Sequence, residues 1–283
     1  MNFHNFNVGT PSSRVQTALT LDQVKAYAPS AFALAAHESR SARYTYVPTV
    51  AIIEGMIKAG FQPFKASQSR SRIAGKSEFT KHMIRFRQDN RVLVVGDTVL
   101  EIVLVNSHDG TSTYQLSLGF WRLACSNGLM VAESTQDMLR IKHSGDIIGE
   151  IIEGSNRIVG GSGKAIAQVQ DWSGLMLTTG EQSALAEAAH ILRFADSEGK
   201  VNTPITASQL LRPRRSEDNG SDLWKTLNRV QENVIKGGLH GVSLENGRRR
   251  HVSTRAVKGI DQDIRLNRAL WQLAERMAEL KAA

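Results

Sequence analysis

The segment at residues 67–76 brings together serine hydroxyls, a glycine and alternating basic side chains, a combination that suits contacts with phosphate groups. Arginine forks, lysine charge and hydroxyl groups hold a sugar-phosphate backbone in place without reading its bases. The strand expected next, at residues 81–87, alternates with a period of two, which predicts one core face and one basic face. A solvated hairpin tip is the alternative interpretation of the loop.

Aromatic residues lie close to these cations in the sequence. Single-stranded nucleic acid is commonly held by bases stacked on aromatic rings beside a positively charged groove, so this neighbourhood favours such a ligand. Strand aromatics usually pack inward, however, and most of these rings are expected in the core. The residues concerned are Phe61, Phe64, Tyr114, Phe120 and Trp121.

Two arginine clusters, at residues 212–215 and 248–250, lie in expected loops that contain glycine or proline. A contact with nucleic acid and a contact with another subunit fit these clusters equally well. Glu217 and Asp218 follow the first cluster directly and are expected to neutralise part of its charge. The residues predicted to bind nucleic acid are Lys65, Arg70, Arg72, Lys76, Lys81, Arg85, Arg87, Arg214, Arg215, Arg248 and Arg249.

The formal net charge of +8 favours a polyanionic partner. Residues 62–91 hold eight Lys or Arg against two acidic residues, and residues 212–258 hold eleven against five. The rest of the chain carries a net negative charge. The basic excess is therefore confined to two segments, which random scatter would not favour.

No motif in the sequence assembles an active site. The potential metal ligands are His82, His108, Cys125 and His143. None of them has the spacing of a known zinc motif. Residues 160–164 form a Gly-rich run that ends in lysine, but Ala165 follows where a magnesium-binding hydroxyl is required. We therefore predict that the protein is not an enzyme and that it needs no metal or other cofactor.

The composition is that of an ordinary globular protein, because hydrophobic residues make up 41% and charged residues 22%. No stretch approaches the roughly 20 apolar residues needed to cross a bilayer, and the first residues lack the apolar core of a signal peptide. The single cysteine fits a reducing compartment. We expect a soluble, cytoplasmic protein with no membrane partner.

Capping residues and hydrophobic periodicity predict where the helices and strands lie. Short helices are expected within residues 21–37, where Thr20 caps the first and Pro29 ends it. Thr49 is expected to cap another helix, which ends at Gly60. Strands are expected at 61–69, 78–87, 99–106, 111–118 and 139–143, and helices at 147–176 with interruptions at Gly154 and 160–163, and at 181–195, 222–236 and 260–282. A Gly- and Arg-rich loop is expected between the last two helices.

Strands crowd the first half of the chain and helices the second, without βαβ repetition, so the predicted fold class is α+β. We expect an antiparallel β-meander with a helix packed on it, a β-β-β-α-like core, in the N-terminal half and a helical C-terminal half. The expected boundaries are 1–18 for a flexible arm, 19–145 for the core domain and 146–283 for a helical region packed on the core.

Several strings in the sequence resemble a bacterial protein family. They are residues 79–85 (FTKHMIR), 106–110 (NSHDG), 120–129 (FWRLACSNGL), 214–218 (RRSED) and 222–233 (DLWKTLNRVQEN). Together they are similar to the phage/plasmid-like family, domain of unknown function nine-three-two, over residues 21–280. The resemblance implies residence on plasmids, prophages and integrative elements, and it implies no particular reaction.

A fainter resemblance links residues 44–61 and the basic meander after them to the Rad-fifty-two-type single-strand annealing proteins. Those proteins assemble into rings and hold single-stranded DNA by its backbone, which implies that basic residues 70–87 line a groove here. We therefore hypothesise a homo-oligomer, such as a ring, that binds single-stranded nucleic acid, DNA in the first place, and promotes annealing or recombination for a mobile element. The alternative hypothesis is an interaction protein that inhibits a host defence or restriction system.

Overall fold

The chain forms two compact units. The first contains Met1–Gly128 and Glu133–Gly163, and the second contains Leu129–Ala132 and Lys164–Ala283. The computed structural model describes residues 17–39, 46–71, 73, 75–89, 94–95, 98–122, 128–130, 139–141, 145–245 and 248–282. Most of the expected arm at residues 1–18 lies outside this range. Helix α3 belongs to the first unit, beyond the boundary expected at residue 145.

The first helix of the first unit begins and ends where the sequence predicts. Thr20 and Gln23 form a capping box that starts α1 (Leu21–Tyr27). Pro29 then opens the 3-10 helix η1 (Pro29–Phe32), since its fixed φ suits the first turn of a helix. Helix α2 (Thr49–Lys58) has Pro48 at its N-cap, so Thr49 is its first residue rather than its cap.

The sheet of the first unit is the predicted antiparallel meander. Its strands β1 (Phe61–Gln68), β2 (His82–Gln88), β4 (Thr98–Asn106) and β5 (Tyr114–Arg122) pair in that order. The remaining elements of this part of the chain are η2 (Ser77–Phe79), β3 (Val94–Val95), which pairs with β4, β6 (Gly128–Met130) and β7 (Leu139–Ile141), which pairs with β5. The β1 strand lies at an edge of this sheet.

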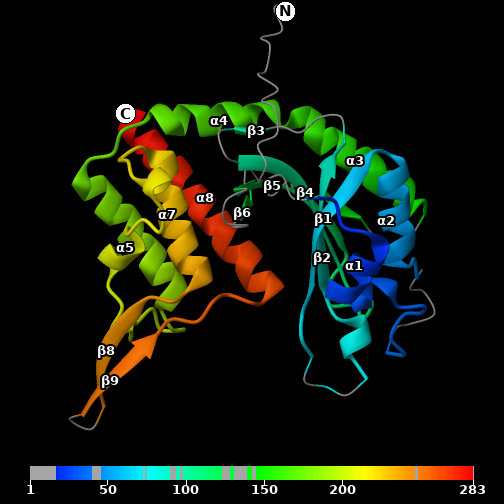
Figure 1. The fold of residues 1–283 in the computed structure, drawn as a ribbon, viewed down its shortest axis with the longest axis horizontal. Helices are drawn as coiled ribbons and strands as arrows, with labels where there is room; N and C mark the ends of the chain where they lie inside the picture. The colour runs from blue at the N-terminus through cyan, green and yellow to red at the C-terminus, as the bar shows by residue number, and fades with distance from the viewer. Residues whose placement is uncertain are drawn as a thin grey trace, which may run out of the picture. The chain divides into compact units, whose positions relative to one another are not determined.

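Helices α2 and α3 (Ile147–Gly161) pack on one face of the sheet (Figure 1). The predicted break at Gly154 is wrong, because α3 continues through this residue. A Cβ atom at Gly154 would lie 2.8 Å from Leu139 Cδ1 and 3.2 Å from Leu116 Cδ1. The glycine therefore serves the close approach of α3 to β5 and β7 rather than a break in the helix.

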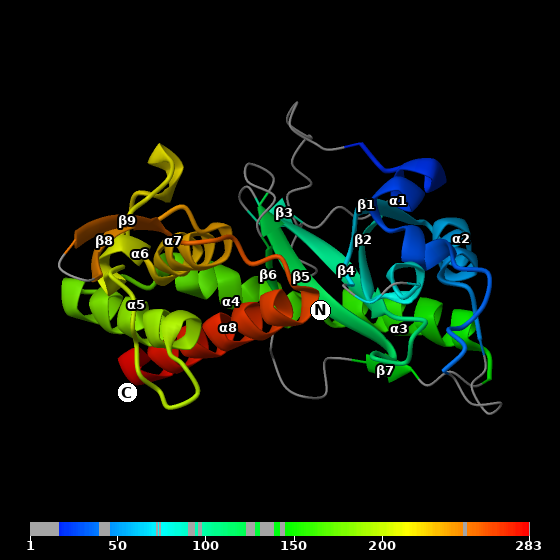
Figure 2. The same ribbon diagram turned by 90° about the horizontal axis from the view of Figure 1, so that it is seen from below.

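The second unit is mainly helical. Its helices are α4 (Gly163–Gly174), α5 (Thr179–Phe194), α6 (Ala207–Leu210), η3 (Ser216–Asp218), α7 (Leu223–Lys236) and α8 (Ile260–Ala282). Helices α5, α7 and α8 lie side by side in both views (Figures 1 and 2). Three buried tryptophans, Trp172, Trp224 and Trp271, pack together, with ring centroids 4.6–6.4 Å apart. They form the core of this unit.

The segment between α7 and α8 corrects one prediction. It is not a loop but an antiparallel hairpin of β8 (His240–Glu245) and β9 (Arg248–Ser253). Asn246-Gly247, which joins the two strands in the sequence, is the commonest two-residue hairpin signal and could have predicted this element. Among the helices that the structure describes, none is long and apolar enough to cross a membrane.

Candidate nucleic-acid interface

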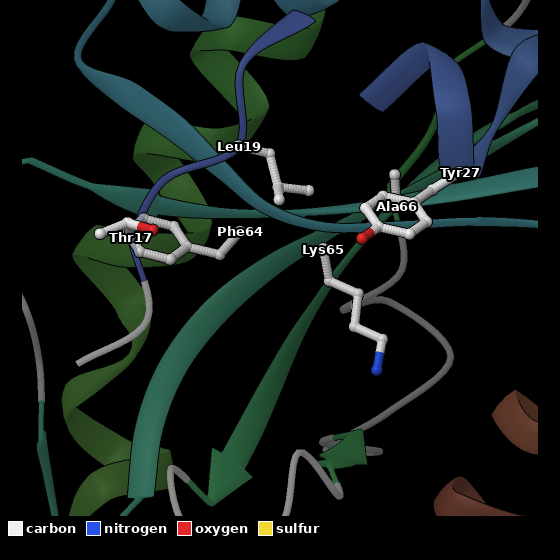
Figure 3. A pocket seen from close by; sticks show the side chains of 6 residues that line it. All are labelled: Thr17, Leu19, Tyr27, Phe64, Lys65 and Ala66. Atoms are coloured by element: carbon white, nitrogen blue, oxygen red, sulfur yellow. The ribbon is translucent and has the colours of Figure 1, made fainter. Parts of the chain in front are cut away.

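A pocket of about 440 Å³ opens beside the edge strand β1. It is lined by Thr17, Leu19, Tyr27, Phe64, Lys65 and Ala66. Figure 3 shows the rings of Tyr27 and Phe64 on opposite sides of the pocket, with Leu19 between them and the Lys65 ammonium reaching away from β1. Tyr27 is 60% exposed and Phe64 is half-buried. The pocket therefore combines two accessible aromatic rings with a lysine.

An irregularity in β1 places the phenylalanine and the lysine. The pairing of β1 with β2 shifts register between Pro63 and Lys65, so Phe64 is an extra residue opposite no partner. Such a bulge redirects side chains that would otherwise alternate between the two faces of the sheet. Phe61, Pro63 and Ala66 are buried, whereas Phe64 and Lys65 are consecutive and both accessible. The bulge thus brings an aromatic ring and a cation to the same pocket.

The segment before α1 completes the pocket. The Leu19 N–H donates a hydrogen bond of 2.7 Å to the Pro63 carbonyl oxygen, which pins this segment along the edge of β1. Proline is tolerated at this position because an edge strand has no second neighbour that needs its missing N–H. Helix α1 follows at once and carries Tyr27 at its last turn, and α1 packs on β1.

A buried carboxylate holds the ring of Phe64 through an arginine. The Arg87 guanidinium lies over the Phe64 ring, 4.0 Å from its centroid, and Arg87 Nε donates a 2.7 Å hydrogen bond to Glu101 Oε1. Arg85 Nε lies 2.6 Å from the other oxygen, Glu101 Oε2. The side chain of Glu101 is 0% exposed. Cation–π contact and ion pairing therefore fix the ring at one wall of the pocket.

These contacts correct the expectation of an open basic face on β2. Arg85 is 2% exposed and Arg87 is 4% exposed, and both pair with Glu101. Period-two alternation correctly separated these arginines from Ile84 and Phe86, but it gave no sign that the second face is buried too. Their partner, Glu101, lies on β4, the strand that pairs with β2. A role of these two arginines in nucleic-acid binding stays a prediction.

Basic residues of the loop between β1 and β2 are at least partly exposed. Arg70 is exposed, and Lys76 and Lys81 are half-buried. The pKa of Asp109 is lowered: burial raises it, but hydrogen bonds from Thr111 and Ser107 outweigh the burial. The charge of Lys76 adds to the lowering. Arg72 lies outside the described residues. Thr80 Oγ1 donates to the Ser69 and Ser77 carbonyl oxygens and ties the ends of the loop together.

The first arginine cluster of the second unit is engaged within that unit. Arg214 Nε donates a 2.8 Å hydrogen bond to Asn233 Oδ1, and another of its nitrogens donates to the Gly237 carbonyl oxygen. Arg215 pairs with Asp218 at 3.2 Å and with Glu232. The expected neutralisation by Asp218 is confirmed. These guanidinium groups anchor α7 to the segment before it, and their predicted nucleic-acid contacts stay predictions.

The second cluster lies on the β8–β9 hairpin. Arg248 and Arg249 are exposed, as are Arg250 and His251 after them. These residues belong to the second unit, and the pocket beside β1 belongs to the first. Ten of the eleven predicted residues, all except Arg72, are described by the structure, and they fall into three groups: buried beside Glu101, engaged beside α7, or at least partly exposed on the β1–β2 region and on the hairpin.

Two of the potential metal ligands do meet, but in a hydrogen-bond network. His82 and His108 are 0% exposed, and their ring centroids lie 5.3 Å apart. Both Nε2 atoms contact Thr49 Oγ1, at 2.9 Å and 3.1 Å, and Asn106 Nδ2 donates to the same hydroxyl at 3.2 Å. Within the described part of the chain, no group of three or more ligand side chains could hold a metal ion. Cys125 and His143 lie outside that part.

The network determines which ring nitrogens carry protons. A hydroxyl has one hydrogen and two lone pairs, so Thr49, which accepts from Asn106, donates to one imidazole and accepts from the other. His82 Nδ1 lies 3.2 Å from the Thr80 carbonyl oxygen and 3.0 Å from Ser30 Oγ; a carbonyl oxygen can only accept, so a proton at Nδ1 satisfies that contact. The His82 Nε2 atom then accepts from Thr49. Burial above all, and then the charge of His108, lowers the pKa of His82 to about 3, so this ring is neutral.

Sequence reasoning missed Tyr27, which lines the pocket, and Glu101, which holds Arg87 against Phe64. Tyr27 was counted only as part of a helix, and Glu101 only as part of a strand of apolar residues. An acidic residue within the run of apolar residues at 99–105 is the available signal, since an unpaired carboxylate is rarely buried. Pro63 is the corresponding signal for the bulge, because a proline within a strand marks an edge strand or a bulge.

Comparisons with known proteins point to one family. Residues 36–271 match the family described as domain of unknown function (DUF932). The chain is 44% identical over 259 residues to the UPF0380 proteins YafZ and YfjQ of Escherichia coli (strain K12), an alignment that covers 92% of this chain and 91% of each relative. No solved structure matches the chain. The fainter resemblance to Rad-fifty-two-type annealing proteins therefore gains no support.

Proposed function

We propose that this chain, which belongs to the DUF932 family, binds single-stranded nucleic acid, DNA in the first place, at the pocket beside β1. The observation that supports the proposal is the pairing of two accessible rings, Tyr27 and Phe64, with Lys65 around one pocket. Every base has a π-face, so such rings hold bases without reading their sequence, and the lysine attracts the phosphates. This chemistry needs no cofactor.

The geometry suits an unpaired strand rather than a duplex. A base has to leave its stack to lie against the ring of Phe64 or Tyr27, and only an unpaired base does so at low cost. The Arg87 guanidinium over Phe64 keeps the ring from turning away from the pocket. A nucleic-acid strand that runs along β1 would meet Lys65 next to the Phe64 ring. It would then meet Arg70 on the connection between β1 and β2.

The proposal covers binding and not annealing. Annealing in a ring was expected from a continuous track of basic side chains along the sheet. Two members of that track, Arg85 and Arg87, are buried beside Glu101. Self-association and a role for a mobile element remain part of the hypothesis on sequence grounds only.

Removing the two rings tests the proposal. We expect the double variant Tyr27→Leu with Phe64→Leu to bind a labelled oligothymidine at least tenfold more weakly than the wild type, because each lost stack costs about 1–3 kcal/mol. Fluorescence anisotropy measures the Kd. Phe194→Leu, which alters a half-buried phenylalanine of the second unit, is the matched control and should leave the Kd unchanged. Equal affinity of the double variant and the wild type would exclude the pocket.

The salt dependence of binding tests the role of the lysine. Each phosphate contact on a single strand adds about 0.7 to the slope of log K against log salt concentration. We expect Lys65→Gln to lower this slope by that amount and Lys200→Gln, at an exposed lysine of the second unit, to leave it unchanged. A wild-type protein that fails to bind oligothymidine at low salt would instead favour the interaction-protein hypothesis.

A further inference from the structure

We propose that the β8–β9 hairpin is a second nucleic-acid contact, a basic β-ribbon that inserts into the major groove of duplex DNA. The inference is independent of the pocket beside β1, because the hairpin lies in the other unit and recognises a different form of the ligand. It rests on three features of the hairpin: its exposed charge, the distribution of that charge over both faces, and its fixed root.

The charge of the hairpin is concentrated and exposed. Arg248, Arg249 and Arg250 are consecutive on β9, all three are exposed, and the exposed His251 follows. Charges on an exposed strand also guard against aggregation, but one charge of either sign serves that purpose. Three consecutive arginines on one exposed strand concentrate positive charge, which attracts a polyanion.

The register places cations on both faces of the ribbon. Arg248 and Arg250 lie opposite Glu245 and Ser243, so they share one face. Arg249 lies opposite Leu244 and therefore projects from the other face, as His251 does. A flat anionic surface would use one face only. A ribbon with arginine on both faces fits between two phosphate-lined walls.

The dimensions of a β-ribbon select the groove. A sheet with its side chains is about 10 Å thick, whereas the major groove of B-form DNA is about 12 Å wide and the minor groove about 6 Å. The deep, narrow major groove of A-form RNA excludes a ribbon. Six-residue strands extend roughly 20 Å, the length of about six base pairs. The contacts are to phosphate, so they position the duplex without reading its sequence.

The root of the hairpin is fixed, so the strands can act as an arm. Leu239 N–H donates to Thr254 Oγ1 at 3.0 Å, and the two backbones pair there. Gly237 turns the chain at φ +65°, where a Cβ atom would lie 2.6 Å from the Thr254 carbonyl oxygen. Gln209 Nε2 holds the His240 carbonyl oxygen at 2.8 Å. Figure 1 shows the strands projecting from the helices of this unit.

Neutralising the arginines tests the inference. The triple variant Arg248→Gln, Arg249→Gln and Arg250→Gln is compared with a control of equal charge, Arg157→Gln, Arg265→Gln and Arg276→Gln, whose arginines are exposed on helices. We expect the hairpin variant to bind a labelled DNA duplex at least tenfold more weakly. The slope of log K against log salt concentration should fall by about 2.7. The loss of affinity between about 50 and 200 mM salt should therefore be roughly 40-fold smaller than in the wild type. The control should match the wild type.

Further measurements distinguish binding at the hairpin from binding at the pocket beside β1. Affinity for oligothymidine should persist in the hairpin variant, whereas the Tyr27 and Phe64 double variant should lose it and keep duplex binding. Duplex RNA should compete poorly with duplex DNA. Unchanged duplex affinity, an equal loss in the control, or an equal loss for oligothymidine would each overturn the inference. So would a change of oligomeric state in sedimentation with DNA affinity intact, because the hairpin would then be a subunit contact.

Discussion

Replacing Glu101 with glutamine is expected to lower the free energy of unfolding by about 3–5 kcal/mol, the usual cost of removing one partner of a buried ion pair. The side chain of Glu101 is fully buried, and it faces the guanidinium groups of Arg85 and Arg87, which are 3% and 4% exposed. Glutamine has nearly the same size, so the change removes charge rather than volume. Two buried cations then lose the carboxylate between them.

Urea unfolding followed by circular dichroism measures this loss as a lower midpoint at an unchanged m value. Glu153→Gln is the matched control: it removes an exposed partner of Arg157 on α3, with side chains 74% and 65% exposed, and should change stability by less than about 1 kcal/mol. If the Glu101→Gln chain does not fold, Glu101→Leu combined with Arg85→Met and Arg87→Met, which removes all three buried charges, should recover folded protein. A loss below about 1 kcal/mol would show that the carboxylate does not balance the arginines.

The second large effect is a loss of stability in mild acid caused by His82. Burial lowers the pKa of this imidazole in the folded chain to about 3, against 6.5 in the unfolded chain. Between these values the unfolded chain binds a proton that the folded chain does not, so stability is complete above pH 6.5 and falls with pH below it. The expected slope is about 1.4 kcal/mol per pH unit.

Urea midpoints measured between pH 7 and pH 5 test this expectation. The carboxyl groups with lowered pKa values, Asp109 and Glu181, add their own loss only below about pH 4.5, because their ordinary values are 3.8 and 4.5. His82→Gln should flatten the dependence, and His251→Gln, at an exposed histidine of the hairpin, should leave it unchanged. A wild-type His82 resonance that titrates near pH 6.5 in NMR would contradict the assignment.

Local signals in the sequence were reliable where one residue or one helical turn decides the structure. Thr20 caps α1 and the helix ends before Pro29, as predicted, and the meander and the helical second half are confirmed. Two errors arose from reading a residue without its neighbours in space. Gly154 suggested a break because glycine disfavours a helix, but here its missing side chain leaves room for Leu139 and Leu116. The Gly- and Arg-rich composition between α7 and α8 predicts a loop, whereas the structure has a hairpin there.

The candidate site shows the same division. The sequence by itself determined that basic residues gather in two segments and that aromatic residues lie among those of the first. The tertiary structure decided which of those charges meet solvent. Arg85 and Arg87 are buried against Glu101, which a separate strand brings beside them, and Tyr27 lines the same pocket as Phe64 because Leu19, just before α1, hydrogen-bonds to Pro63. Net charge is a property of the chain, whereas exposure depends on partners that are distant in sequence.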